Sequence, residues 1–284
     1  MKLITRCLFL SILTLTSLFS VQDTAAQAYD ATLKFADNQF MAGNYNEASK
    51  AYRRALFFSG ERQNLYIISR IADISFYEKD YETAQRYYGL AYNMADDESL
   101  KTEFLFNKAS SHILEDNFQM ALIDLFSVSD TGTTVKKRLY FFLGTCYYGL
   151  QDFEKARVYF SYCVGEQEKQ PLEALFNSKK LTSPSPKKAR ILSMILPGLG
   201  QTYSGDIKSG LNSILLTSGI VVLGVRISLL YSPMDALIAV LPWYQRYYTG
   251  GYGKAEGIAE KKLAERRSEI YQEILALIRK SNEM

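Results

Sequence analysis

Residues that could carry out chemistry are scarce in this chain. It has one histidine, His112, and three cysteines, two of which, Cys146 and Cys163, fall on predicted helices. A general base or a nucleophile needs a partner within hydrogen-bond reach. His112 has no serine, cysteine or carboxylate at a recognisable catalytic spacing, and so few His and Cys residues leave little material for a metal site. The sequence therefore predicts a protein that is not an enzyme and that needs no cofactor or metal.

The two helical cysteines leave two interpretations open. Cys146 and Cys163 occupy positions that suit small buried residues on helices, where a free thiol behaves as a small apolar group. In an oxidising compartment the same pair could instead form a disulfide.

One glycine-rich segment, residues 197–205, has the composition of a phosphate-binding loop. No strand is predicted before it, and no Lys-Ser or Lys-Thr pair directly follows its last glycine, although a phosphate loop requires both. The glycines instead allow a tight chain reversal and close helix packing, and Gln201 could satisfy backbone groups that the reversal exposes. The motif residues are Pro197, Gly198, Gly200, Gln201, Tyr203 and Gly205.

Composition indicates a folded chain with two differently built halves. Of 284 residues, 48% are hydrophobic and 22% are charged, which suits a chain that buries a core. The formal net charge of +3 is too small for electrostatic capture of nucleic acid by the whole molecule. All six prolines lie between Pro171 and Pro242, so the first 170 residues contain none.

The first half of the chain repeats itself. Aromatic residues recur at Tyr45, Tyr81, Phe118 and Phe153, spaced by 36, 37 and 35 residues. Nine residues before each of them stands a small residue, namely Ala36, Ala72, Ala109 and Gly144. This pattern predicts two closely packed helices per unit, with turns at Gly43-Asn44, Lys79-Asp80, Asp116-Asn117 and Gln151-Asp152. No unit can bury its apolar face alone, so the units must stack.

The repeat pattern resembles the tetratricopeptide repeat. Its clearest unit has Gly43, Tyr45, Ala48, Tyr52 and Ala55, and matches occur in four units across residues 29–165. The period slightly exceeds the usual 34 residues of that family, and the usual unit-ending proline is absent. The resemblance implies an all-α fold, a tetratricopeptide-like helical solenoid whose concave face is lined by the first helix of each unit and binds proteins.

That concave face supplies the predicted partner-binding groove. The repeat register places on it Asp37, Phe40, Asp73, Phe76, Tyr77, Phe106, Phe141 and Tyr148. An aromatic groove with an acidic edge suits an extended or helical apolar segment of a protein or peptide partner that carries a basic residue. The lysine and asparagine pattern with which some family members clamp a terminal carboxylate is missing. Alternatively, several of these aromatic residues, especially Phe40, Phe76 and Tyr148, pack against the next unit.

The N-terminus has the three-part pattern of a secretory signal peptide. Lys2 and Arg6 precede an apolar run over residues 7–21, and Ala26-Gln27-Ala28 forms a cleavage site. We therefore expect residues 1–28 to be removed and the repeats to lie in the periplasm, in the cell envelope. The alternative is an uncleaved anchor helix, although the run is shorter than the ~20 residues that a span needs.

The second half has the composition of a membrane-associated domain. Residues 166–190 are expected to form a capping helix and an extended basic linker suited to anionic lipid. Within residues 191–250, three apolar stretches cover 191–203, 211–231 and 234–248, and only the middle one is long enough to span a bilayer. Aromatic residues typical of the headgroup level cluster at Trp243, Tyr244, Tyr247 and Tyr248. The number of crossings stays open, and a hairpin or re-entrant arrangement is favoured.

The glycine-rich motif adds a second resemblance. The order Pro197-Gly198-x-Gly200-Gln201-x-Tyr203-x-Gly205 is similar to a Pro-Gly-x-Gly-Gln-x-Tyr-x-Gly signature from a family of small bacterial membrane domains whose function is not established. The resemblance covers residues 187 to about 257. It implies a hydrophobic helical domain that contacts membrane lipid.

Residues 251–284 are expected to form an amphipathic C-terminal helix. Its apolar stripe contains Ala259, Leu263, Ile270, Ile274 and Leu277. The stripe could pack on the repeats, lie on the membrane surface or pair with a second copy to form a homo-oligomer, and the sequence does not choose among these.

Two functions follow from these expectations. The first is a membrane-anchored cell-envelope scaffold or adaptor that binds a protein partner through its repeat groove. The second is an accessory factor in membrane-protein assembly or transport, in which the C-terminal membrane domain is the working part and the repeats are a docking arm.

Overall fold

The computed structural model describes residues 27–58, 64–129 and 132–283. The chain divides into two compact units, Met1–Cys163 and Val164–Met284. Throughout the described ranges the secondary structure is helical, with no strand. The predicted fold class, a tetratricopeptide-like solenoid followed by a hydrophobic helical unit, is confirmed. The predicted signal peptide falls on residues 1–28, of which only 27 and 28 are described, so that prediction lies almost wholly outside the described residues.

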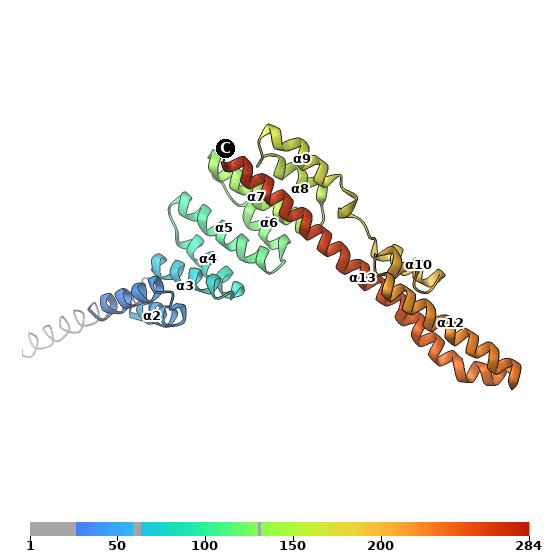
Figure 1. Cartoon of the computed structure of the whole chain (residues 1–284). Helices are drawn as coiled ribbons and strands as arrows, with labels where there is room; N and C mark the ends of the chain where they lie inside the picture. Colours follow the sequence, from blue (N-terminus) through green and yellow to red (C-terminus); the bar gives the residue numbers. More distant parts are fainter. Residues whose placement is uncertain (1–26, 59–63, 130–131, 284) are drawn as a thin grey trace, which may run out of the picture. The chain divides into compact units, whose positions relative to one another are not determined.

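The first unit is a row of helical hairpins (Figure 1). Its helices cover residues 27–41, α2 (Tyr45–Phe58), α3 (Leu65–Tyr77), α4 (Tyr81–Met94), α5 (Glu98–Leu114), α6 (Phe118–Phe126), α7 (Thr133–Gly149) and α8 (Phe153–Ser161). From α2 onward, each helix packs against the next along the chain. Each hairpin therefore shares its apolar faces with its neighbours, as a solenoid requires.

The four turns within the hairpins have the same backbone conformation. Gly43, Lys79, Asp116 and Gln151, each two residues before the repeat aromatic, have φ values of 75°, 63°, 57° and 64°. After each, a backbone N–H reaches back five residues, as from Asn44 to Gln39 O at 2.9 Å. This is the bonding of a Schellman helix end, for which glycine is preferred. Three turns have a non-glycine residue in the left-handed region, at a cost of about 1–2 kcal/mol each.

Burial repeats with the same period. Ala36, Ala72 and Ala109 are fully buried, and so are the alanines three residues after each repeat aromatic, Ala48, Ala84, Ala121 and Ala156. In the fourth unit Gly144 replaces alanine, because a Cβ atom there would lie 2.8 Å from the Phe160 ring. The predicted requirement for small residues between paired helices is confirmed.

The second unit is built along one long helix. Its elements are α9 (Glu166–Phe176), η1 (Lys179–Leu181), α10 (Pro186–Ile195), α11 (Leu199–Tyr203), α12 (Ile207–Leu230) and α13 (Pro233–Glu283). The 51 residues of α13 extend about 76 Å at 1.5 Å per residue. All the other elements of this unit pack on α13 (Figure 1). Its first part forms a hairpin with α12, and its last turns contact α9, where Ser281 Oγ accepts from Gly165 N at 2.7 Å.

The structure corrects three expectations for this unit. The predicted extended linker is folded: Leu181 is buried, and its carbonyl accepts a hydrogen bond from Arg267 at 3.0 Å. The amphipathic stripe is already covered inside the unit, with Ala259 and Ile274 fully buried. No helix break occurs at Gly250–Gly253, so the third apolar stretch and the C-terminal helix are one element.

Candidate functional site

The two predicted acidic groove residues are engaged by tyrosine hydroxyls. Asp37 Oδ1 accepts hydrogen bonds from Tyr52 Oη at 2.6 Å and from Tyr66 Oη at 2.8 Å. Asp73 accepts one from Tyr88 Oη at 2.9 Å and lies 3.5 Å from Arg70. Burial raises the pKa of Asp73, although the Tyr88 hydrogen bond and the Arg70 charge oppose this. These carboxylates therefore join the paired helices of the first two hairpins.

The same positions change character in the later hairpins. Ser110 and Thr145 replace the two aspartates, and each hydroxyl donates to the carbonyl four residues earlier, at 2.7 Å and 3.0 Å. Leu125 and Phe160 replace the tyrosines and are fully buried. The sequence carried this signal, because Asp and Tyr occur 15 residues apart in units one and two but in neither of the others.

Three predicted groove aromatics pack across the hairpin turns. Ring centroids lie 5.8 Å apart for Phe40 and Tyr45, 5.7 Å for Phe76 and Tyr81, and 5.2 Å for Tyr148 and Phe153. All three pairs are edge to face, which is the favoured geometry of aromatic contacts. These residues therefore pack as the alternative supposed, but mainly within their own unit: each ring meets the repeat aromatic five residues later, and only Phe40 also contacts a ring of the next unit, Tyr77.

Phe106 was placed wrongly in the groove. It is fully buried and stacks on Phe142 with centroids 5.5 Å apart, while the Arg138 guanidinium covers it at 4.3 Å. The repeat register selected the correct helix, but the side chain at this position points into the core that α5 shares with α7. Phe141 is half-buried and touches Phe160 edge to face at 6.2 Å.

The accessible part of the predicted groove is an arginine–aromatic face on α3 and the helix over residues 27–41. We define this face by Phe40, Tyr66, Arg70 and Tyr77. The Arg70 guanidinium lies 4.9 Å from the Phe40 ring and 5.1 Å from the Tyr66 ring, and Tyr77 is 55% exposed. Cation–π contacts of this kind hold the guanidinium in place. The sequence prediction missed Arg70, whose signal was its spacing from Tyr66 and Asp73 on one helix face.

A separate hollow of about 470 Å³ lies between α2 and the helix over residues 27–41. Its lining includes Phe35, Glu47, Lys50 and Arg54. None of the predicted groove residues lines it, so its charges and shape give no support to the groove assignment.

His112 belongs to a buried polar cluster in the third hairpin. Lys108 Nζ lies 2.7 Å from Asp124 Oδ1, and His112 Nε2 lies 3.5 Å from Asp124 Oδ2, which is too long for a hydrogen bond. Burial lowers the pKa of His112, so neutral imidazole is favoured. Within the described ranges no group of three or more His, Cys, Asp or Glu side chains could hold a metal.

Both cysteines are free thiols, and only Cys146 lies on a helix, because α8 ends at Ser161 and Cys163 is in the turn after it. Cys146 and Cys163 are both buried, and burial raises the pKa of each to about 12. Of the two interpretations that the sequence left open, the structure shows the small buried residue.

The glycine-rich motif forms the crossing point of α10, α11 and α13. Gln201, 1% exposed, accepts from Ser193 Oγ at 2.8 Å and donates to the Gly251 carbonyl at 2.8 Å. Ser193 Oγ in turn accepts from Gly200 N at 2.9 Å. A buried network of this kind is stabilising only when every member has a partner. Gln201 was predicted to satisfy backbone groups within the reversal, but its backbone partner is on α13, and in the reversal Ser193 bonds the Gly200 N–H while Gln201 holds Ser193.

The glycines and Pro197 of the motif produce the reversal itself. Pro197 and Gly198 are the central residues of a turn closed by a hydrogen bond from Leu199 N to Leu196 O at 3.0 Å. Gly198 has a φ of 92° and a ψ of −16°, as at the third position of a type II turn. A Cβ atom at Gly200 would lie 1.9 Å from the Ala189 carbonyl oxygen. The motif therefore serves close helix packing.

The remaining motif residues close the reversal at both sides. Gly205 ends α11 with a φ of 91°, and Tyr203 Oη accepts from Ser185 N at 3.2 Å. Lys188 lies over the Tyr203 ring at 5.2 Å. All six motif residues thus belong to one structural junction between the start of α10 and α12.

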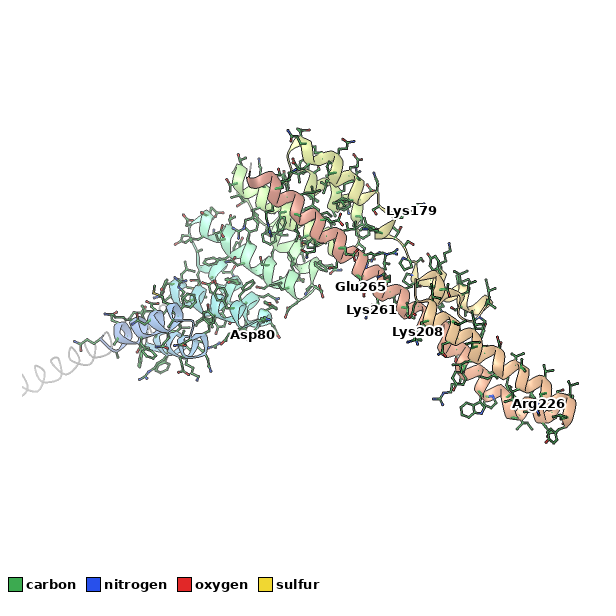
Figure 2. All side chains as sticks on the ribbon, viewed as in Figure 1. Asp80, Lys179, Lys208, Arg226, Lys261 and Glu265 are labelled. Atoms are coloured by element: carbon green, nitrogen blue, oxygen red, sulfur yellow. The ribbon has the colours of Figure 1, made fainter. Side chains whose placement is uncertain are left out.

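The hairpin formed by α12 and α13 has an apolar exterior. Within the described residues, α12 alone is long and apolar enough to cross a membrane; 18 consecutive residues of it have a mean hydropathy of 2.0, and 6% of them are buried. Its 24 residues rise about 36 Å, compared with about 30 Å of bilayer hydrocarbon. Exposed side chains include Leu215, Val222, Leu229 and, on α13, Ile238. Figure 2 shows Lys208 near the start of α12 and Arg226 near the far end of the hairpin.

Comparison with known proteins adds one structural likeness. Among solved structures, the chain is similar to a TPR repeats protein from Bacteroides fragilis NCTC 9343, with 12% sequence identity and a TM-score of 0.37. The match covers 86% of this chain and 98% of that protein. No protein-family model and no curated protein matches the chain. The description of the first unit as a solenoid rests on its own turns and buried positions.

Proposed function

We propose that this chain is a membrane-anchored scaffold of the cell envelope whose repeats bind a protein partner. The observation that carries the proposal is the exposed apolar surface of α12 in a chain whose other unit is a helical-hairpin solenoid. An apolar helix of this length gains free energy on transfer to lipid, and solenoids present extended binding surfaces. The signal-peptide pattern of residues 1–28 supports a periplasmic position for the repeats.

The partner surface that we propose is the arginine–aromatic face, extended along the row by Phe141. Exposed aromatic rings and a guanidinium fixed by stacking are typical of energetically dominant interface residues. Asp37 and Asp73 lie beside the face; Asp73 is already paired with Arg70, so Asp37 supplies the negative charge. This chemistry suits an apolar peptide segment with a basic residue.

Partner recovery from cells tests the surface. In the full chain, Tyr77→Ser with Phe141→Ser keeps the net charge and removes two rings, and we expect at least a tenfold loss of the recovered partner. Phe126→Ser is the matched control, because Phe126 is 60% exposed on the second helix of its hairpin. Equal recovery with the first variant and with wild type, with helicity unchanged, would refute the groove assignment.

Membrane insertion and sidedness are tested by fractionation with protease accessibility. We expect the chain to resist carbonate extraction and the repeats to be cleaved by protease added to the periplasm. Release of the chain by carbonate would exclude the membrane anchor. If the repeats resisted the added protease while the inner membrane was intact, the proposed periplasmic position would be excluded.

A second function places the activity in the hairpin unit, as an accessory factor in membrane-protein assembly or transport. It is favoured by one observation, a polar cavity of about 270 Å³ between α12 and α13. Removing residues 187–284 discriminates the two functions. If the repeats alone restored wild-type behaviour to a strain that lacks this protein, the second function would be excluded.

A further inference from the structure

The polar cavity lies between α12 and the first part of α13, which form the apolar hairpin, and most of the residues that line it are polar or charged. It is lined on α12 by Ser209, Asn212, Ser213 and Thr217, and on α13 by Arg246 and Lys254. Side chains of this kind on a membrane-type hairpin are costly unless they meet one another, water or a ligand. The cavity of about 270 Å³ is far larger than the ~30 Å³ of one water molecule.

The charge balance of the cavity favours an anion. Arg246 and Lys254 are both cationic, and no carboxylate is among the residues that line it. The neighbouring acid, Asp206, lies outside the lining, where it caps α12 by accepting a hydrogen bond from Ser209 N at 2.9 Å. Its carboxylate also interacts with Lys254 and Lys208, so Arg246 is the cation of the cavity that it does not offset. Asn212 adds an amide donor, and Arg supplies the planar fork that binds phosphate oxygens.

The cavity also lies at the depth expected for lipid headgroups. Gly251 is opposite Ser213 and Gly224 is opposite Val240, so the cavity is at the base of the hairpin, away from its tip at Tyr231. From Asn212 to Leu230, α12 rises about 27 Å, close to the thickness of bilayer hydrocarbon. Arg246 lies five residues from Gly251 toward the tip, about 7.5 Å along α13. A side chain of its length can reach back from there to the headgroups at the base.

Tyr247 lies at the level of the cavity, and Trp243 lies one turn nearer the tip of the hairpin. Tyr247 lines the cavity and stacks on Trp243 with centroids 6.4 Å apart, and both rings are exposed. Trp and Tyr concentrate at membrane–water interfaces, where one edge of the ring is apolar and the other is hydrated. A phosphate bound beside them would sit with its acyl chains along the apolar exterior.

We propose that this cavity binds the phosphate group of an anionic membrane phospholipid. Arg246 and Lys254 contact the phosphate oxygens, Asn212 and Ser209 donate hydrogen bonds, and the acyl chains follow the outer surface of the hairpin. The choice of a lipid as the source rests on the proposed membrane insertion. The chemistry of the cavity does not depend on it.

Binding is measured with the full chain in a nonionic detergent, so that lipid retention is scored without a bilayer. The probes are phosphatidylglycerol, phosphatidylcholine and soluble glycerol phosphate, and native mass spectrometry counts the bound molecules. We expect at least tenfold tighter binding of phosphatidylglycerol than of phosphatidylcholine. Tighter binding of glycerol phosphate than of phosphatidylglycerol would overturn the lipid assignment.

Variants separate a specific site from general charge attraction. Arg246→Gln with Lys254→Gln is expected to lose at least tenfold in phosphatidylglycerol binding. Arg226→Gln with Lys261→Gln removes the same charge outside the cavity and should stay within twofold of wild type (Figure 2). Equal losses in both double variants, or none in the first, would overturn the proposal.

Two further measurements keep the outcomes distinct. Arg246→Lys with Lys254→Arg preserves both positive charges, and we expect its phosphatidylglycerol binding to stay within threefold of wild type. Loss of binding in this variant, with its helicity intact, would also contradict the proposed site. Carbonate extraction of the first double variant scores anchoring separately. A chain that inserts but shows no lipid preference refutes the cavity proposal alone, whereas one that binds lipid but is extracted refutes the anchor.

Discussion

Gly200→Ala is the substitution that tests most directly how the chain reversal is held. A Cβ atom at position 200 would lie 1.9 Å from the Ala189 carbonyl oxygen and 2.5 Å from Ser193 Oγ, whereas ordinary contact begins at 3.4 Å. Because the nearest atom belongs to the backbone, α10 and α11 would have to separate by about 1.5 Å. That movement stretches the 2.9 Å bond from Gly200 N to Ser193 and the 2.8 Å bond from Ser193 to Gln201 beyond hydrogen-bonding range.

The magnitude follows from the groups left without partners. Each buried polar group without a hydrogen bond costs about 1–3 kcal/mol, and overpacking adds about 1–3 kcal/mol. We therefore expect the free energy of local opening of α10 and α11 to fall by about 3–6 kcal/mol. At about 1.4 kcal/mol per factor of ten, this loss corresponds to at least hundredfold faster amide exchange.

Hydrogen exchange of the full chain in detergent, read on peptides from residues 186–206, measures this loss. Gly257→Ala is the matched control, because a Cβ atom there meets nothing within 4 Å and the residue is helical. The control should be neutral or more stable by up to about 1 kcal/mol. If Gly200→Ala exchanged within threefold of wild type, the close approach of α10 and α11 would not hold the reversal, and our account of the motif would be refuted.

Three further predictions concern the first unit. Tyr88→Phe removes the hydroxyl that donates to Asp73, and we expect a loss of about 1–2 kcal/mol in a urea titration; an unchanged midpoint would contradict the structural role of this pair. Burial lowers the pKa of His112, so the native state binds fewer protons than the unfolded state, and stability should fall as the pH drops below about 6.5. His112→Asn should make the melting temperature depend less on pH in this range. A pH profile identical to that of wild type would refute the role of His112. Cys146 and Cys163 should react with maleimide only after unfolding, and rapid labelling of either native thiol would contradict their burial.

The solenoid could be predicted because each repeat carries its own local instructions. The small residues and the turn positions recur with the period of the hairpin, and helix pairing needs little beyond them. The left-handed turn conformation, in contrast, could be predicted only at Gly43, since Lys79 and Gln151 are residue types that do not favour a positive φ. Their conformation is imposed by the two helices that they join.

The groove could be predicted only as far as the correct helices. Repeat register assigns a residue to a helix face, but neighbouring side chains decide whether it reaches the surface. Phe106 is buried because Phe142 on α7 covers it, and Asp37 is occupied because two tyrosines converge on it. Those contacts come from other elements of the fold, and a single repeat pattern does not contain them.

The continuity of α13 could not be predicted for the same reason. Glycine lowers helix stability by up to about 1 kcal/mol per residue, so Gly250, Gly251 and Gly253 indicate a break when considered alone. In the structure, Gln201 donates to the Gly251 carbonyl, and the absence of a side chain at Gly251 allows Ser213 to approach. Tertiary contacts thus replace the stability that the local sequence lacks.

Two sets of residues at the base of the hairpin therefore have different roles, one in folding and one in ligand binding. Gly200 and Gln201 are directed at backbone atoms of the same unit, so their substitution should change folding whatever the cavity binds. Arg246 and Lys254 are directed at the cavity, so their substitution should change ligand binding while the reversal stays intact. Gln201 is the residue that belongs to both sets, because it lines the cavity and holds the Gly251 carbonyl. A ligand in the cavity would therefore contact the side chain that joins α11 to α13. We expect its binding to slow the opening of the reversal, and amide exchange in the peptides from residues 186–206 measures this.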